Sequence, residues 1–220
     1  MIDIIKATLG DQIYAVLRDD IINQRIECGE KLTLKALQER FDISSTPIRE
    51  AIKRLSQEGL VEHVTNVGAK VIDIDEKDIR EIYDFCSVLD VAALRFAINS
   101  DRFDEMLQEM ENCIKSQEIC LDNGSMESFK LHSDNFHDIL YKYADNSRLY
   151  DAAKNIRSQF TILTTKYQNF LNAGALILAG HKEILEAIKS KDIENASSLM
   201  TRHFEHSKNY LLKSLGEEIY

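Results

Sequence analysis

Hydroxyl and basic side chains surround the only proline of this chain. Ser44, Ser45 and Thr46 directly precede Pro47, and proline is tolerated in the first turn of a helix. Hydroxyls at that position can accept hydrogen bonds from the free backbone N–H groups of the helix start. Arg49 follows shortly after. A short helix with hydroxyls at its start and a guanidinium beside them is expected to fit the major groove of DNA.

The expected helix has one apolar side and one basic side. Its apolar residues recur at steps of three and four, which predicts a buried face: Ile48, Ala51, Ile52 and Leu55. Its basic residues fall largely outside that face: Arg49, Lys53 and Arg54. The helix is therefore expected to pack on other elements with one side and to turn basic groups outward with the other.

The segments around this helix indicate how it is positioned. An opening helix is expected over residues 9–21, and a second over residues 34–41 with Thr33 as its cap. Two strands are expected over residues 59–64 and 69–74, with a turn between them. Three helices followed by a β-hairpin are typical of a winged helix-turn-helix, in which the third helix enters the DNA groove and the hairpin touches the backbone.

From about residue 75 the pattern changes to helices alone. Polar breaks separate about six helical segments, a number suited to an antiparallel bundle. The first carries a stripe that we expect to be buried: Ile79, Ile82, Cys86, Leu89, Ala93 and Phe96. The sequence thus predicts a mostly α protein, with a winged helix-turn-helix over residues 1–74 and an all-helical antiparallel bundle over residues 75–220.

The net charge of −10 argues against a uniformly basic nucleic-acid binder. Residues 1–72 carry 10 basic and 11 acidic side chains, whereas the remainder carries 17 basic and 26 acidic ones. Since phosphates repel an acidic surface, DNA binding is expected in the N-terminal third of the chain.

Composition also bears on location. The four cysteines show no C-x-x-C spacing, and no apolar run reaches the length of a membrane span. The first residues lack the pattern of a signal peptide. We therefore expect reduced thiols and a cytoplasmic protein.

Both halves contain patterns shared with known regulators. In the first half they are Ile26-x-x-Gly29-Glu30-Lys31-Leu32, Leu37-x-x-x-Phe41, Ser44-x-Thr46-Pro47-Ile48-Arg49-Glu50-Ala51-Ile52 and Leu55-x-x-x-Gly59-Leu60-Val61. On these, residues 9–74 resemble the GntR-type winged-helix transcription regulators. In the second half they are Leu89-Asp90-x-Ala92-Ala93, Phe136-His137, Asn146-x-x-Leu149, His181-x-x-Ile184-Leu185-x-Ala187-Ile188 and Asp192-x-x-x-Ala196-x-x-x-Met200-x-x-His203. On these, the helical half resembles the FCD effector domain of the FadR-like branch.

The resemblance implies a cytoplasmic homodimer that binds a palindromic operator as a transcriptional regulator, usually a repressor, and not an enzyme. It places these residues at the DNA: Lys35, Ser44, Ser45, Thr46 and Arg49, with Asn66 and Gly68 on the wing. Arg49 is the strongest candidate for a base contact, because its guanidinium can pair bidentately with guanine. Ser45 replaces an arginine common in the family, which puts the family's usual operator sequence in question.

Many effector domains of this branch hold a divalent metal with one aspartate and three histidines. The matching histidines are His137, His181 and His203, and imidazoles from different helices suit Zn²⁺ or Ni²⁺. Ser133 occupies the family's aspartate position, so Asp134, on roughly the same helix face, is expected to replace it, with water as the alternative ligand. The resemblance thus implies a bound divalent metal and a small-molecule effector, which is often an organic acid in this branch.

Two residues leave the effector site open to other interpretations. Cys86 stands where relatives often carry an arginine for a carboxylate ligand, so the effector is either less anionic or bound by another cation such as Arg157. Together, Ser133 and Cys86 also support a DNA-binding dimer whose effector site has decayed. The histidines support a third hypothesis, a metal-dependent hydrolase with an accessory winged helix, although the sequence has no H-E-x-x-H pattern.

Overall fold

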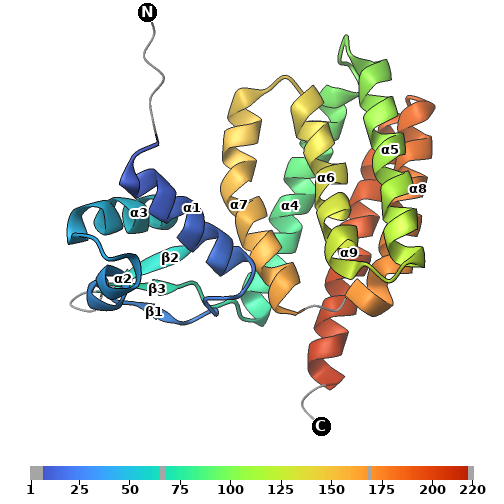
Figure 1. The fold of residues 1–220 in the computed structure, drawn as a ribbon. Coiled ribbons are helices and arrows are strands. Elements are labelled where there is room, and N and C mark those ends of the chain that lie inside the picture. Colours follow the sequence, from blue (N-terminus) through green and yellow to red (C-terminus); the bar gives the residue numbers. More distant parts are fainter. Residues whose placement is uncertain (1–6, 65–67, 168–169, 218–220) are drawn as a thin grey trace, which may run out of the picture. The chain divides into compact units, whose positions relative to one another are not determined.

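The computed structural model describes residues 7–64, 68–167 and 170–217 of the chain (Figure 1). The chain divides into two compact units. Unit 1 contains the described residues up to Asp75 together with Asn155–Lys166, and unit 2 contains Glu76–Lys154 and the described residues from Tyr167 onward. No helix in these ranges combines the length and the apolar character needed to cross a bilayer.

Unit 1 contains a winged helix-turn-helix. Its elements are α1 (Leu9–Ile22), β1 (Lys31–Leu32), α2 (Leu34–Phe41), α3 (Ser45–Gln57), β2 (Val61–Val64) and β3 (Gly68–Val71). β3 lies between the other two strands and pairs antiparallel with both, with Val61 opposite Val71 and Lys31 opposite Lys70. The three helices and the hairpin that the sequence predicts are confirmed.

The hairpin strands are shorter than predicted, and a third strand joins them. Gly59 follows α3 in a left-handed conformation (φ +69°), so β2 begins at Val61 rather than at residue 59. β3 ends at Val71 rather than at residue 74. The pattern does not predict β1, because a strand of 2 residues is too short to show periodicity.

The two helices of the helix-turn-helix begin differently. Thr33 caps α2 as predicted, since its Oγ1 accepts a hydrogen bond from the backbone N–H of Ala36 at 3.3 Å. Ser44 precedes α3 in an extended conformation, but its side chain makes no capping hydrogen bond. The expected hydroxyl cap is therefore wrong for Ser44, which is exposed at the start of α3.

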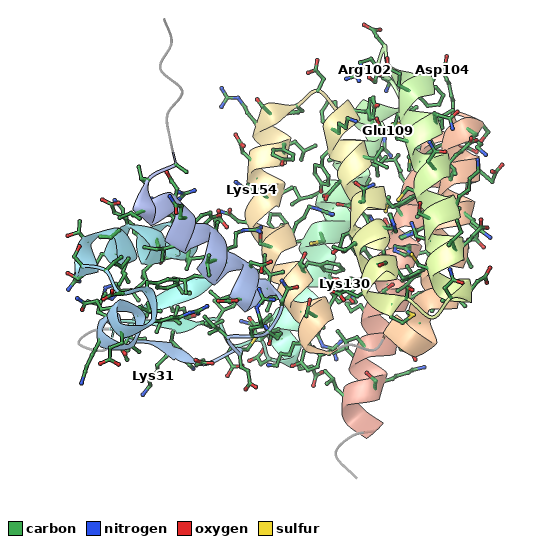
Figure 2. The ribbon with its side chains drawn as sticks, viewed as in Figure 1. Lys31, Arg102, Asp104, Glu109, Lys130 and Lys154 are labelled. Carbon is green, nitrogen blue, oxygen red and sulfur yellow. The ribbon has the colours of Figure 1, made fainter. Side chains whose placement is uncertain are left out.

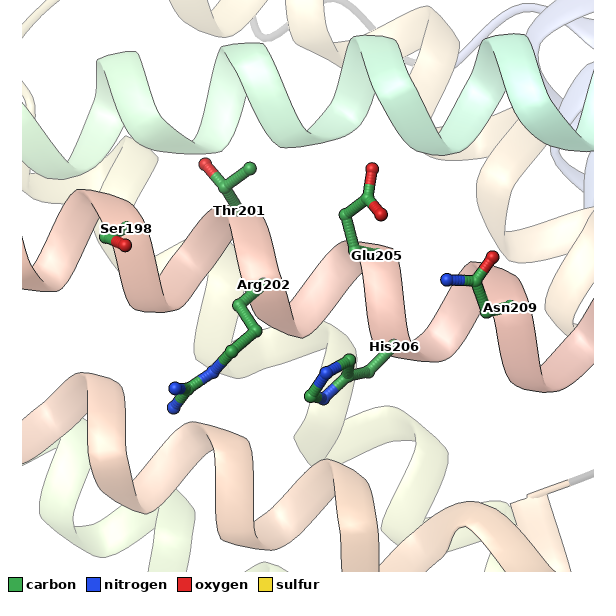
Figure 3. Close-up of a pocket in the computed structure, with 6 residues that line it drawn as sticks. All are labelled: Ser198, Thr201, Arg202, Glu205, His206 and Asn209. Carbon is green, nitrogen blue, oxygen red and sulfur yellow. The ribbon is translucent and has the colours of Figure 1, made fainter.

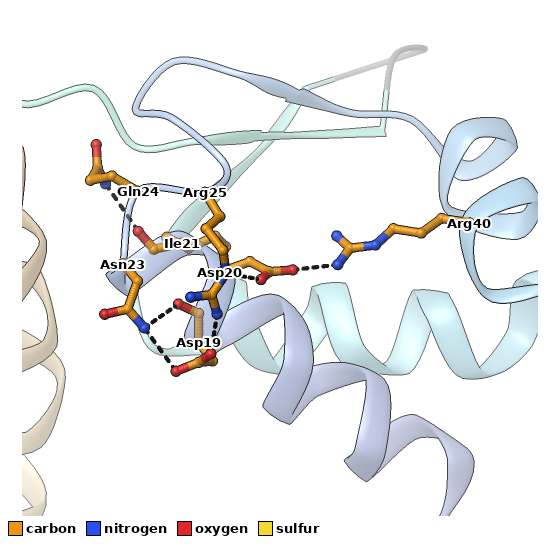
Figure 4. Close-up of polar contacts among 7 residues, drawn as sticks. All are labelled: Asp19, Asp20, Ile21, Asn23, Gln24, Arg25 and Arg40. Atoms are coloured by element: carbon orange, nitrogen blue, oxygen red, sulfur yellow. Dashed lines mark hydrogen bonds and ion pairs between the residues drawn. The ribbon is translucent and has the colours of Figure 1, made fainter.

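A carboxylate near the end of α1 joins three segments of the winged helix (Figure 4). Asp20 is buried, and its two oxygens accept hydrogen bonds from Arg25 Nε at 2.6 Å and from Arg40 Nη2 at 2.5 Å. Arg25 follows α1, and Arg40 lies in the last turn of α2. Burial raises the pKa of Asp20, but the hydrogen bonds to both guanidinium groups outweigh this and lower it.

Replacing Asp20 by asparagine is expected to lower the free energy of unfolding by about 2 kcal/mol, because a buried charge-assisted pair is lost. Asp19→Asn is the matched control, since Asp19 also pairs with Arg25 but its side chain is 64% exposed. Urea unfolding of both variants measures the difference, and equal losses would contradict the role of Asp20. The wild-type contribution is complete above the ordinary aspartate pKa of 3.8 and is lost as the pH falls through the lowered pKa of the folded state.

Unit 2 is an all-helical bundle. Its elements are α4 (Glu76–Ala97), α5 (Phe103–Asp122), α6 (Met126–Tyr143), the part of α7 (Ser147–Lys166) up to Lys154, α8 (Phe170–Lys189) and α9 (Ile193–Glu217). α4 packs on α9 and α6, α5 packs on α6 and α8, and α8 packs on α9. Glu109 is labelled on α5 in Figure 2. Its carboxylate accepts hydrogen bonds from two residues of α6, from Lys142 Nζ at 2.6 Å and from Tyr143 OH at 2.8 Å.

The apolar stripe predicted on α4 is buried except at its end. Cys86 and Ala93 are buried, but Phe96 is 50% exposed and Ala97 is buried in its place. The prediction for Phe96 is wrong because an α-helix advances 3.6 residues per turn, so that the fourth residue after Ala93 continues the stripe rather than the third. The same buried side also contains a carboxylate, Asp90, which is fully buried.

Candidate functional site

The residues predicted to face DNA gather at the start of α3. Ile48, Ala51 and Leu55 are fully buried, so the opposite side of this helix is turned outward. Thr46 and Arg49 lie on that side and are exposed. This arrangement presents a hydroxyl and a guanidinium within one helical turn of each other, and both groups can hydrogen-bond base edges in the major groove.

The other residues predicted at the DNA surround this helix start. Ser44 is exposed and Ser45 is half-buried, and Lys35 is exposed on α2 with an ion pair to Glu39 at 3.9 Å. Asn66 lies outside the described residues. A role in DNA contact stays a prediction for each of these positions.

Gly68, predicted on the wing, also meets a backbone requirement of the sheet. It has φ +121°, and a Cβ added there would lie 2.7 Å from the carbonyl oxygen of Leu32. A larger side chain would therefore force β3 away from the end of β1. This packing requirement accounts for the glycine whether or not it also approaches DNA.

The basic residues of α3 have different surroundings. The Arg54 guanidinium lies 3.9 Å from the centre of the Tyr14 ring and pairs with Asp11, so it is engaged with the segment of α1. Arg49 and Lys53 are exposed and have no ion-pair partner among the described residues. These two side chains are therefore the basic groups that α3 leaves available for phosphates and base edges.

Three histidines meet inside unit 2. His137 comes from α6, His181 from α8 and His203 from α9, and one ring nitrogen of each lies within 4.8 Å of the others. The rings are buried or nearly so, and Phe136 stacks on His181 with 4.2 Å between the ring centres. The structure thus brings together the three histidines that the resemblance selects from distant parts of the sequence.

A buried carboxylate orients the first of these rings. Asp90 Oδ2 lies 2.6 Å from His137 Nδ1, and Asp90 Oδ1 accepts a hydrogen bond from Tyr141 OH at 2.6 Å. An ionised carboxylate can only accept, so Nδ1 of His137 donates and its Nε2 keeps a free lone pair. A carboxylate behind a histidine is the usual support of a metal ligand.

An amide orients the second ring in the same way. Gln117 Nε2 donates to the His132 carbonyl at 3.4 Å, which turns Gln117 Oε1 toward His181 Nδ1 at 2.8 Å. An amide oxygen accepts, so His181 Nδ1 donates and its Nε2 also keeps a lone pair.

The two oriented rings point their lone pairs at each other. His181 Nε2 lies 3.2 Å from His137 Nε2, a distance that two lone pairs tolerate only with a proton or a cation between them. Burial, followed by His203 and His137, holds the pKa of His181 well below its usual range. Burial, followed by His137, lowers the pKa of His203 to about 3. Buried imidazole nitrogens that converge in this way fit a divalent cation such as Zn²⁺ or Ni²⁺.

A glycine makes room for the third ring. A Cβ added at Gly180 would lie 2.6 Å from His203 Nδ1, so α8 can approach this ring only because residue 180 has no side chain. Gly180 and His203 also line a hollow of about 220 Å³ between α8 and α9. Arg202 and Glu183, which pair with each other, line the same hollow, so a charged wall leads to the histidines.

The outer face of α9 continues this wall. A wider, open hollow there is lined by Ser198, Thr201, Arg202, Glu205, His206 and Asn209 (Figure 3). Arg202 and His206 project from the same side of α9 and line both hollows. A guanidinium and an imidazole thus lie beside the space that reaches His203.

The carboxylate predicted to complete the metal site is paired with a lysine, and its role as a ligand stays a prediction. Asp134 Oδ2 forms an ion pair with Lys130 Nζ at 3.6 Å, and Figure 2 labels Lys130. Among the described residues, Asp134 is not one of those whose ligand atoms converge with the three histidines. Ser133, at the family's aspartate position, is buried. The sequence patterns do not identify Asp90 and Gln117 as the groups that orient the histidine rings. Asp90 could have been noticed, because it is a charged residue on the apolar side of its helix.

Known proteins share both halves of this arrangement. The family described as "Bacterial regulatory proteins, gntR family" matches residues 9–71, and the "FCD domain" matches residues 81–206. The HTH-type transcriptional repressor RspR of Escherichia coli (strain K12) is 27% identical over 199 residues, which cover 90% of this chain and 86% of the relative. The gluconate operon transcriptional repressor of Bacillus subtilis (strain 168) is 26% identical over 196 residues, with 85% and 78% covered. The solved structure of a putative transcriptional regulator GntR from Rhodococcus sp. RHA1 has the same fold, with a TM-score of 0.77 at 19% identity over 93% of this chain and 97% of the other.

Proposed function

The chain belongs to the GntR family of bacterial regulatory proteins, in the branch with an FCD domain, and from this premise we propose that a small molecule held at the histidine cluster controls its affinity for operator DNA. It is a DNA-binding transcriptional regulator and not an enzyme, and curated relatives are repressors. The observation that carries the proposal is the 3.2 Å approach of two imidazole nitrogens that are both oriented as acceptors. In this proposal the protein works in the cytoplasm, where its operator lies.

A divalent metal is the group that this cluster fits best. His137, His181 and His203 would hold it, and Asp90 and Gln117 would keep the first two rings in the ligating orientation. The fourth position belongs to Asp134, if its side chain turns from Lys130, or to water. When bound, the metal supplies a Lewis-acidic attachment point for an oxygen ligand.

The hollow beside His203 favours an anionic chelating effector. It measures about 220 Å³, and a carboxylate in it could replace Glu183 as the partner of Arg202 and accept a hydrogen bond from the His206 ring. Cys86, at the position where relatives often carry an arginine, is buried in the bundle. An organic acid that binds the metal through oxygen and reaches Arg202 therefore suits this chain without that arginine.

The alternative hypotheses are less well supported. A metal-dependent hydrolase is set aside because the relatives are regulators. A decayed effector site would not need Asp90 and Gln117 to hold two buried rings in complementary orientations, because an unused cavity gains stability from apolar filling. The oriented rings thus favour a working site over a bundle that only dimerises.

An apolar stripe on α4 supports a homodimer. Phe85, Val88 and Phe96 are 49%, 64% and 50% exposed and recur on one side of the helix. Exposed large apolar side chains in a row mark interaction surfaces, and a second copy of the chain would match the two half-sites of a palindromic operator.

Val88→Asp is expected to convert the dimer into a monomer, because a charge in the stripe would be buried without a partner. Leu131→Asp is the matched control, since Leu131 is also 64% exposed but lies on α6. Light scattering after size-exclusion chromatography gives the mass of each variant. A monomeric wild type, or a Val88→Asp variant that stays dimeric, would rule this surface out.

The proposed function is tested by the affinity of the full-length protein for its own promoter region. Specific operator binding should exceed binding to a shuffled fragment of the same length by roughly 1,000-fold at matched physiological salt. Equal affinity for the two fragments would contradict the proposal.

A further inference from the structure

The C-terminal end of the DNA-reading helix is completed by side chains from α7. Residues Asn155–Lys166 belong to the same compact unit as the winged helix, although α7 starts at Ser147 in unit 2. Within unit 1, this part of α7 makes hydrogen bonds with α1 and with the end of α3. None of the residues assigned to DNA contact lies on α7.

The backbone after α3 leaves one carbonyl of the last turn to an outside donor. The last four carbonyls of a helix have no partner within it. Leu60 N–H donates to Leu55 O at 2.9 Å and Gly59 N–H donates to Ser56 O at 3.1 Å, with Gly59 in the left-handed conformation. Glu58 N–H donates to the carbonyl of Arg54, the first of these four. The carbonyl of Gln57 is the remaining one of the four.

Two side-chain amides of α7 donate hydrogen bonds to backbone carbonyls at the end of α3 and in the turn after it. Asn155 Nδ2 donates to Gln57 O at 3.1 Å, and Gln159 Nε2 donates to Gly59 O at 3.2 Å. The two amides lie one helical turn apart, so a single face of α7 follows the chain from the last residue of α3 through its turn. Arg18 Nη2 of α1 donates to Ser158 Oγ at 2.9 Å and fixes the same part of α7 to a second helix of the unit.

The turn is shaped for this contact. A Cβ added at Gly59 would lie 2.5 Å from Gln159 Nε2, so the glycine both adopts φ +69° and gives the amide its space. The Gln159 amide nitrogen that donates to Gly59 O therefore also favours glycine at residue 59.

We infer that Asn155 and Gln159 are positioning residues for DNA binding: they hold the end of α3 and so set how its first turn is presented to the major groove. The inference rests on the proposed function, because it concerns specific binding to operator DNA. Since α7 begins in unit 2, the affinity for an operator then depends on a helix that carries none of the residues assigned to DNA contact.

The test compares specific with non-specific binding in the full-length double variant Asn155→Ala, Gln159→Ala. Its affinity for the protein's own promoter fragment should fall roughly 5-fold to 10-fold, as expected for two lost hydrogen bonds. Its affinity for shuffled DNA should stay near that of wild type, because non-specific binding depends on the charge of the phosphates rather than on the orientation of α3. A variant that is merely less well folded would lose both affinities equally, so the ratio of the two identifies a positioning role.

Thr161→Ala, Thr165→Ala is the matched control. Both hydroxyls also bond carbonyls, at 3.0 Å and 2.7 Å, but those carbonyls belong to α7 itself. The control should keep the wild-type ratio. If wild type prefers its promoter and the Asn155, Gln159 variant keeps the same preference, the inference is overturned while the proposed function stands. If wild type itself shows no preference, the proposed function fails first.

A double-mutant cycle checks the contact without requiring every variant to be fully active. Gly59→Ala and Gln159→Ala are measured singly and together for promoter affinity. Because the alanine methyl group meets the Gln159 amide, the effect of Gly59→Ala should be at least about threefold smaller when Gln159 is already alanine. Strictly additive effects would show that the two residues do not act on DNA binding through their contact.

Discussion

His181→Ala is expected to abolish stoichiometric metal binding. His181 is fully buried, and its Nε2 lies 3.2 Å from that of His137, so its removal takes away one of the three converging nitrogens. Protein purified without chelator or metal-affinity tag should contain close to one Zn²⁺ or Ni²⁺ per chain by mass spectrometry of the metal content, and the variant should contain almost none. In wild type, Zn²⁺ at 1,000 times its dissociation constant should stabilise the folded state by about 4 kcal/mol, whereas the variant should gain nothing.

Two controls separate the ligands from their surroundings. His132→Ala removes another histidine of α6 that is outside the converging group and should retain the metal. Asp90→Asn should weaken metal binding about 10-fold to 100-fold, because it removes the carboxylate that orients His137. Asp134→Asn then decides the fourth ligand: a comparable loss favours Asp134, and no loss favours water. Wild-type protein without metal, or a metal content unchanged by His181→Ala, would contradict the site.

Arg49→Ala is expected to lower promoter affinity about 10-fold to 100-fold and to relax sequence preference. Arg49 is exposed on the outward side of α3, and a bidentate contact with a base contributes about 1–3 kcal/mol of discrimination. Anisotropy titrations with the promoter fragment and with single-base variants of it measure both effects.

Lys53→Ala is the comparison for this prediction. Lys53 is also exposed on α3, but an ammonium group acts on phosphates as a point charge. Its loss should weaken binding to promoter and shuffled DNA alike. The slope of the logarithm of the binding constant against the logarithm of the salt concentration should become smaller by about one. If Arg49→Ala shows this same uniform loss, Arg49 contacts phosphate and does not read a base.

Local periodicity predicted most of the fold. The buried face of α3 follows directly from the spacing of Ile48, Ala51 and Leu55, and the change from strands to helices after residue 75 marks the bundle. Errors occurred where local signals end. The stripe of α4 continues to Ala97 and not to Phe96, because its last step is four residues rather than three. β1 forms only because β3 offers it a partner distant in sequence.

The convergence of the three histidines was predictable from the sequence, but the groups that orient their rings were not. The three histidines follow a spacing shared with known effector domains, whereas Asp90 and Gln117 reach them from α4 and α5 through packing that no local pattern encodes. Asp134 has a partner that its spacing from His137 does not indicate, since it pairs with Lys130 four residues before it on the same helix. Its role as the fourth ligand stays a prediction.

The contact between α7 and the end of α3 could not have been predicted from the sequence. Asn155 and Gln159 look like ordinary polar residues of an exposed helix face, and only the fold places the carbonyls of Gln57 and Gly59 beside them. Such capping partners depend on three-dimensional proximity alone, since a free helix end accepts a donor from any part of the chain.

The central claim is that the state of the histidine cluster controls operator affinity. The most direct measurement is the dissociation constant of the full-length protein for its own promoter fragment, metal-free and saturated with Zn²⁺ or Ni²⁺, at one salt concentration. We expect the two dissociation constants to differ at least about fivefold in wild type and not to differ in His181→Ala. Equal dissociation constants for metal-free and metal-saturated wild type would contradict it.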